Sequence, residues 1–257
     1  MKVIYEVRDR VAYITINRPE VMNAMDPEVY DLLSKAWIDV RDNPEVWVAI
    51  ITGAGDKAFT AGADLKSDAV REREKSDFCM TQKDMILNRG LEVWKPVIAA
   101  VNGYCLAGGM TLLFATDIRI AAEHSVFEIS EVKRGLLPGN GGTQRILNQL
   151  PYTIAMEMLL LGRRLNAEEA LKYGLINKVV SQKNLISTAE QYARQLCENA
   201  PLSLRVIKEL AIRSQSLPLE QGIRLEEALL EFLRTTEDAK EGPKAFSEKR
   251  KPVYRAR

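Results

Sequence analysis

Residues 97–110, which read VIAAVNGYCLAGGM, decide the fold class. The first five form an unbroken apolar run, which is typical of a β-strand covered on both faces. A loop of small residues follows, and Gly108 and Gly109 lead into a second apolar run over residues 110–115. We expect a helix to begin there, with free backbone amides at its N-terminus.

Similar patterns precede this stretch. Residues 11–16 are rich in β-branched side chains and residues 46–51 form another apolar run, so both segments predict strands. Between them, Asp26 can cap a helix that Pro27 opens, with apolar residues on one face as far as Val40. Strands that alternate with helices indicate an α/β fold.

The C-terminal part of the chain has a different pattern. Beyond about residue 185 helical periodicity replaces the strand signals, and Pro201 and Pro218 mark breaks between helices. We therefore predict a core over residues 1–195 that carries the site, followed by a helical region over residues 196–257. Residues 66–92 are charged and weakly periodic, which predicts a solvated helix face without chemistry.

The bulk composition excludes several classes of protein. Among 257 residues, 36 Lys and Arg balance 35 Asp and Glu, so the net charge of +1 favours neither nucleic acid nor an anionic membrane as partner. No apolar run is long enough to span a bilayer. Cys79, Cys105 and Cys197 form no CxxC pair, which argues against a disulfide framework or a thiolate zinc site. We expect a cytoplasmic enzyme with a small-molecule substrate.

Several catalytic motifs are missing from the sequence. His124 is the single histidine, so a zinc site with two or three imidazole ligands is impossible, and we expect no metal site. Neither a GxGxxG loop after a strand nor a GxxxxGK[ST] loop occurs. The chain therefore lacks the usual loops for binding dinucleotides or nucleoside triphosphates.

Two loops of small residues follow buried strands, where α/β proteins commonly bind ligands. The first spans residues 52–65 and the second spans residues 102–110. A third segment places Glu131 just before a glycine-rich stretch at 138–145. Either loop alone would predict a plain turn, and Glu131 alone could be a general base or a surface charge.

At these three segments the sequence resembles the crotonase superfamily, also called the enoyl-CoA hydratase/isomerase family. The resemblance covers essentially the whole chain. It is carried by AIITG at 49–53, FTAGADL at 59–65, KPVIAAVNG at 95–103, TDIR at 116–119, GLLPGNGGTQR at 135–145, LGRRL at 161–165 and ALKYGLI at 170–176.

The resemblance implies a spiral of ββα units and a homotrimer or a dimer of trimers, with a helical C-terminal region between subunits. It also implies an acyl-CoA thioester substrate and no cofactor beyond the coenzyme A of that substrate. The backbone amides of Ala63 and Gly108 would form an oxyanion hole for the thioester oxygen. The path of the pantetheine and adenine would be lined by Ala61, Asp64, Leu65 and Lys66.

Family hydratases use two glutamates, and this chain matches one of them. Glu131 corresponds to the glutamate that exchanges the proton at the α-carbon. The position of the other glutamate is held by Thr111, which cannot act as a carboxylate base. We nevertheless expect a hydratase or dehydratase, with water held by Thr111 or Asn140.

Three alternatives stay open at this point. Glu131 alone suits a Δ3,Δ2-enoyl-CoA isomerase, in which one carboxylate removes and returns the proton. A protein of this fold could also bind acyl-CoA without turnover. A hydrolase or dehalogenase on the same scaffold would need a carboxylate elsewhere or a histidine near the thioester, and His124 does not fit that position.

Overall fold

A computed structural model describes residues 1–68, 86–87 and 90–257 of the chain. Its described part contains a six-stranded sheet with the order β1-β2-β3-β5-β7-β10. β1 and β2 pair antiparallel, and the other neighbours pair parallel. The strands are β1 (Val3–Arg8), β2 (Val11–Ile16), β3 (Val48–Gly53), β5 (Val97–Val101), β7 (Ile118–Ala122) and β10 (Lys178–Val180).

The described helices follow the strands in alternation and then dominate the C-terminal part. They are α1 (Pro27–Asp42), α2 (Leu65–Asp68), α4 (Gly108–Leu113), α5 (Gly142–Gln149), α6 (Tyr152–Leu161), α7 (Ala167–Lys172), α8 (Leu185–Cys197), α9 (Pro201–Arg213), α10 (Leu219–Arg234) and α11 (Glu237–Ser247). Short 3₁₀ turns are η1 (Pro19–Val21), η2 (Glu131–Arg134) and η3 (Gln182–Asn184). Most of the predicted segment 66–92 lies outside the described residues.

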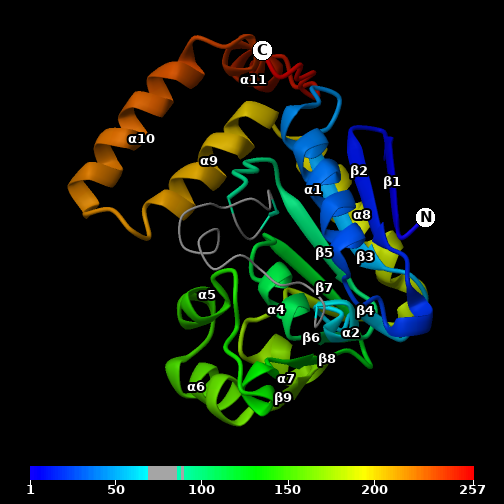
Figure 1. The fold of residues 1–257 in the computed structure, drawn as a ribbon. Coiled ribbons are helices and arrows are strands. Elements are labelled where there is room, and N and C mark those ends of the chain that lie inside the picture. The colour runs from blue at the N-terminus through cyan, green and yellow to red at the C-terminus, as the bar shows by residue number, and fades with distance from the viewer. Residues whose placement is uncertain (69–85, 88–89) are drawn as a thin grey trace.

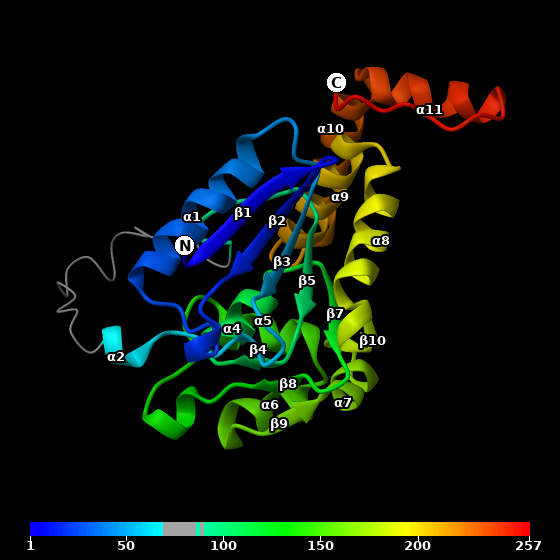
Figure 2. The ribbon, with the colours of Figure 1, turned by 90° about the vertical axis from the view of Figure 1, so that its right-hand side faces the viewer.

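The central strands are covered on both faces, as their apolar runs predict. Ala49 and Ile51 of β3 belong to the core beneath α1, whereas Ile50 belongs to a second core beneath α8. Figure 1 and Figure 2 show α1 and α8 on opposite sides of this sheet. β3 begins at Val48, two residues later than predicted, because Val46 is still part of the turn that follows α1.

Helix α1 begins as its sequence predicts. The carboxylate of Asp26 accepts a hydrogen bond from the amide of Val29 at 2.9 Å, and Pro27 occupies the first helical position. Val40 and Trp37, on the apolar face of the helix, are fully buried against the sheet.

A second sheet of four short strands lies beside the first, in the order β4-β6-β8-β9. Its strands are β4 (Ala58–Thr60), β6 (Tyr104–Leu106), β8 (Val126–Glu128) and β9 (Arg164–Asn166). The chain passes from β3 to β4 to α2, then from β5 to β6 to α4, and next from β7 to β8. This repetition of ββα units confirms the predicted crotonase-like fold.

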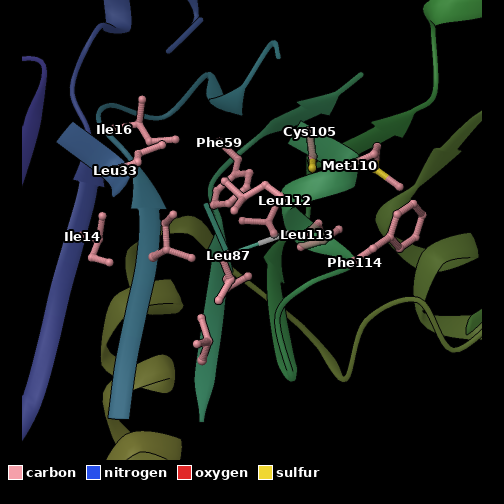
Figure 3. Packing of buried hydrophobic residues seen from close by; sticks show 14 of the residues in the cluster. Ile14, Ile16, Leu33, Phe59, Leu87, Cys105, Met110, Leu112, Leu113 and Phe114 are labelled. Carbon is pink, nitrogen blue, oxygen red and sulfur yellow. The ribbon is translucent and has the colours of Figure 1, made fainter. Parts of the chain in front are cut away.

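The core between the two sheets fixes the start of α4. Met110 and Leu113 of that helix are fully buried and pack in one cluster with Phe59 of β4 and Cys105 of β6 (Figure 3). Turning α4 by half a turn about its axis would expose these side chains to water, so apolar packing holds the N-terminus of the helix in place.

Helix α9 lies at the end of the large sheet, where Lys208 pairs with Asp117, and α10 lies farther from the sheets (Figure 1). The predicted boundary at residue 195 falls in the last turns of α8, which packs on the large sheet. The tail after α11 folds back on this helix, where buried Asp238 accepts hydrogen bonds from the amides of Arg255 and Ala256 at 2.8 and 2.9 Å. Within the described ranges no helix combines the length and apolarity that crossing a membrane requires.

Candidate active site

A cleft of about 1060 Å³ lies between the start of α2, the N-terminus of α4 and η2. The structure brings all nine predicted site residues to its walls. They are Ala61, Ala63, Asp64, Leu65, Lys66, Gly108, Thr111, Glu131 and Asn140. The three loops that sequence analysis selected therefore meet at one place, although they are far apart in the chain.

Two backbone amides stand close together in this cleft. A Cβ atom added to Gly62 would lie 2.7 Å from the amide nitrogen of Gly108, and one added to Gly108 would lie 3.4 Å from the amide nitrogen of Ala63. Only glycine lets these two segments approach so closely. Within the described part of the chain, neither the Ala63 nor the Gly108 amide donates a hydrogen bond. The pair can accordingly donate to one ligand oxygen.

The backbone of Ala107 turns the chain into α4. Its φ of 48° and ψ of −117° are sparsely populated by non-glycine residues and store strain. The amide of Ala107 donates to the carbonyl oxygen of Glu128 at 2.9 Å, and its own carbonyl accepts from Met110 at 2.8 Å. These bonds hold the strained residue and leave the next amide, that of Gly108, facing away from the helix ladder.

Glu131 is the first residue of η2, which follows β8 and ends at Gly135 in a left-handed conformation with φ of 69°. Its Oε2 atom is buried and has no hydrogen-bond partner among the described residues. Burial raises the pKa of the Glu131 carboxyl above its ordinary value, and the charge of Glu128 adds to this rise. A carboxyl group with raised proton affinity in a cleft suits proton transfer near neutral pH.

Glu128 was not selected from the sequence, yet it shapes this turn. The residue is 3% exposed, and its carboxylate accepts hydrogen bonds from Lys133 at 2.8 Å and from Arg164 at 2.6 Å. Burial opposes ionisation, but these two cations outweigh it and lower the pKa of Glu128. In the sequence, Glu128 is a charged residue at the end of a strand. Such residues are common at protein surfaces, so this position alone does not indicate a functional role.

Thr111 lies in the second turn of α4 and is 2% exposed. Its hydroxyl donates to the carbonyl oxygen of Gly108 at 2.9 Å. Gly142, at the start of α5, packs so closely that an added Cβ would lie 2.5 Å from the Thr111 methyl group. Asn140, with φ of 52°, precedes α5 on the same side of the cleft.

The first loop contributes both wall and support. The Asp64 carboxylate forms an ion pair with Arg18 at 3.1 Å and accepts from the amide of Lys66 at 3.3 Å, so it orders the loop from within. Leu65 and Lys66 are exposed at the mouth of the cleft. Arg18 was missed by sequence reasoning, although its position in the turn after β2 was a usable signal.

His124 lies away from this site. Its side chain is exposed, and Nε2 is 2.7 Å from the carbonyl oxygen of Asp56. Among the residues that the structure describes, no three His, Cys, Asp or Glu side chains gather as metal ligands would.

A second cavity, of about 730 Å³, lies between α9 and the end of the large sheet. Charged groups in its walls have partners within the protein: Lys208 pairs with Asp117 at 2.7 Å, and buried Arg119 donates to Gln149 at 2.8 Å. These contacts indicate that the cavity is part of the polar packing between α9 and the end of the large sheet.

Known proteins resemble the chain over its whole length. The sequence profile of the enoyl-CoA hydratase/isomerase family matches residues 6–257. The chain is 42% identical to an (E)-benzylidenesuccinyl-CoA hydratase of Thauera aromatica, with 99% of each chain covered. It is 42% identical to a carnitinyl-CoA dehydratase of Salmonella enteritidis, over 95% of this chain and 94% of that one.

The fold leads to the same group of proteins. The crystal structure of an enoyl-CoA hydratase from Mycobacterium tuberculosis matches with a TM-score of 0.92 and 37% identity, covering 100% of this chain and 99% of that chain. One molecule thus combines the ββα units with the loops that carried the resemblance, and those loops meet in the cleft. The chain belongs to the enoyl-CoA hydratase/isomerase family, within the crotonase superfamily.

Proposed function

We propose that this enzyme adds water across the α,β double bond of an enoyl-CoA thioester, or removes water in the reverse direction. The observation that carries this proposal is the cleft in which two unengaged amides, of Ala63 and Gly108, share the walls with the buried carboxyl of Glu131. The relatives named hydratase and dehydratase support the same reaction class.

The two amides would bind the thioester oxygen. When water adds at the β-carbon, electron density moves through the double bond to this oxygen and an enolate forms. Donors already in place stabilise the enolate without reorganisation, and one such donor is typically worth about 3 kcal/mol. Ala63 and Gly108 are therefore the proposed oxyanion hole.

Glu131 would carry the proton in both halves of the reaction. As the water oxygen bonds to the β-carbon, its proton passes to the Glu131 carboxylate. The same carboxyl then protonates the α-carbon of the enolate, which restores the carbonyl and the ionised glutamate. One water molecule is added, and Thr111 and Asn140 hold it in this proposal.

The mouth of the cleft would bind the coenzyme A portion of the substrate. Ala61 and Asp64 lie deeper along the first loop, and Leu65 and Lys66 lie exposed at its outer end. A flexible cation such as Lys66 can attract the phosphates of the ligand. No metal ion and no further cofactor take part in the proposed reaction.

The assembly that we propose is a homotrimer or a dimer of trimers, in the cytoplasm. Helix α10 contributes to no core and exposes Leu219, Ile223, Leu230 and Phe232, the last with 53% of its surface accessible. Exposed apolar side chains of this size on one helix are typical of a surface that packs against a partner. The proposed partners of α10 are further copies of this chain.

The test is turnover of trans-2-enoyl-CoA, followed by loss of the absorbance of the conjugated thioester. We expect the absorbance to fall in the wild-type enzyme and to persist with Glu131→Gln. The isomerase alternative, which the lone glutamate favours, predicts instead that 3-enoyl-CoA gains this absorbance. Tight acyl-CoA binding with no conversion of either substrate would identify a binding protein.

A further inference from the structure

A small hollow adjoins the cleft behind Thr111. Its volume is about 10 Å³, and Gly108, Thr111, Tyr30 and Asn140 line both the hollow and the cleft. Space of this size holds about one water molecule and excludes an acyl chain. The remaining walls come from Met25, Leu33, Trp37, Ile86 and Leu112.

One residue that lines this hollow carries a buried donor that the described part of the chain does not satisfy. Trp37 of α1 is fully buried, and its Nε1–H group has no hydrogen-bond acceptor among the described residues. Buried indole N–H groups normally find an acceptor, because an unmatched donor loses the hydrogen bonds it makes in water. A water molecule in the hollow would therefore supply an acceptor for the Trp37 N–H group.

The walls also supply enough polar partners. A buried water takes two to four hydrogen bonds, and Trp37, Thr111, Tyr30 and Asn140 are the lining residues whose side chains carry polar atoms. Thr111 is the position at which a family hydratase has its second glutamate. The hollow thus lies next to the place where the water-binding carboxylate is missing.

We propose that the hollow is a one-water subsite, in which a water molecule accepts a hydrogen bond from Trp37 and is held beside the Thr111 hydroxyl. This inference rests on the proposed hydration reaction and assigns the source of its nucleophile. The bound water passes into the cleft and its oxygen bonds to the β-carbon. Its proton goes to Glu131, and the electron pair of the double bond moves to the thioester oxygen. Trp37 is a positioning residue, because it orients the water and does not contact the substrate.

Kinetics of Trp37→Phe test the assignment, since this change keeps a buried aromatic ring and removes the N–H donor. The volume lost with the smaller ring is matched in the control variant below. We expect kcat for hydration to fall about tenfold, because a water that has lost the hydrogen bond from Trp37 is placed beside the double bond less often, with KM unchanged. Exchange of the α-hydrogens of butyryl-CoA in deuterated water needs Glu131 and the two amides but no added water, so its rate should stay at the wild-type value. Thr111→Val should likewise slow hydration and leave the rate of α-hydrogen exchange at the wild-type value.

Trp47→Phe is the matched control, because Trp47 is also buried but lies in the core beneath α8. Its rates of hydration and of α-hydrogen exchange should both equal those of the wild type. Wild-type hydration by Trp37→Phe, or an equal fall of hydration and α-exchange, would overturn the role of Trp37.

A crystal structure of the wild-type enzyme tests the subsite without turnover. We expect an ordered water within about 3 Å of Trp37 Nε1, lost in Trp37→Phe. A wild-type hollow without that water would overturn the inference. Failure of the wild type to hydrate any enoyl-CoA would instead overturn the proposed function, so the two failures are distinguishable.

Discussion

Lys133 donates a hydrogen bond to the carboxylate of Glu128 at 2.8 Å, and this ion pair spans the turn that begins with Glu131. Lys133 also donates to the carbonyl oxygen of Gly162 at 2.8 Å, so the turn is tied to the end of α6. Arg164 completes the arrangement on the other side of the Glu128 carboxylate. The buried carboxylate of Glu128, paired with two partly exposed cations, thus ties down this turn and adds a negative charge near the proposed acid/base group.

Replacing Glu128 should change the pH profile of the enzyme. Glu131 must be ionised to take a proton from water, so the rate should fall as the pH drops through its raised pKa. Glu128→Gln removes a negative charge that raises this pKa and leaves two cations nearby. We expect the acid limb of kcat/KM to move to lower pH.

Glu157→Gln is a suitable control, because Glu157 pairs with Arg163 at the surface and does not line the cleft. Its acid limb should coincide with that of the wild type. An acid limb that stays in place or moves to higher pH in Glu128→Gln would contradict the electrostatic role of Glu128.

Glu131→Gln should separate catalysis from stability. We expect turnover to fall at least about a hundredfold, as loss of a general acid/base does, with acyl-CoA binding retained. Burial raises the pKa of Glu131 in the folded state, so the carboxyl of the unfolded chain ionises at lower pH than that of the folded protein. At a pH above both pKa values, Glu131 therefore lowers the free energy of unfolding. The variant should therefore melt at a higher temperature than the wild type at pH 7.

This gain in melting temperature should vanish at pH values below the ordinary carboxyl pKa of 4.5, where both states are protonated. Calorimetry across this range checks the sign. A variant that melts lower than the wild type at neutral pH would show that the Glu131 carboxylate is stabilised by the fold.

Two adjacent glycines should respond differently to alanine. A methyl group on Gly108 would meet ordinary contacts of 3.4 Å but would stand over the amide of Ala63, so Gly108→Ala should fold and lose about a hundredfold in kcat. A methyl group on Gly109 would lie 2.8 Å from the carbonyl oxygen of Thr60. Gly109→Ala should instead lose about 1–3 kcal/mol of unfolding free energy.

Kinetics and urea denaturation of the two variants distinguish these effects. Equal loss of stability in both would mean that Gly108 is needed for packing alone. Full activity in Gly108→Ala would remove its amide from the proposed oxyanion hole.

The exposed apolar side chains of α10 should control assembly. Leu230→Glu combined with Phe232→Glu places charges where we propose that other subunits pack. Light scattering during size-exclusion chromatography should give a mass of three or six times 28.9 kDa for the wild type and a smaller mass for this variant. Glu226→Gln, an exposed change on the same helix, should leave the mass unaltered. A wild-type protein of single-chain mass would refute the proposed assembly.

Long, regular patterns allowed much of the fold to be predicted. The start of α1 was correct because Asp26 and Pro27 form a local cap, and β5 was correct because its apolar run is contiguous. The strands of the small sheet, such as β9, contain three residues each and are too short to show a period. Their pairing depends on partners distant in the chain.

The site was predictable in part, for a related reason. Glycine-rich loops indicate close approach of the main chain, and the resemblance to the crotonase superfamily selected the amides of Ala63 and Gly108 within them. Glu128 depends on Arg164, 36 residues away, and the importance of Trp37 depends on an acceptor that is missing around its ring. Such relationships arise from three-dimensional packing, and a single sequence does not display them.

Incubation with trans-2-enoyl-CoA in water enriched in oxygen-18 tests the proposed hydration most directly, with products followed by mass spectrometry. The account predicts a 3-hydroxyacyl-CoA that carries one heavy oxygen, formed by the wild type and nearly absent with Glu131→Gln. A shifted double bond without heavy oxygen, or recovery of unchanged substrate, would contradict it.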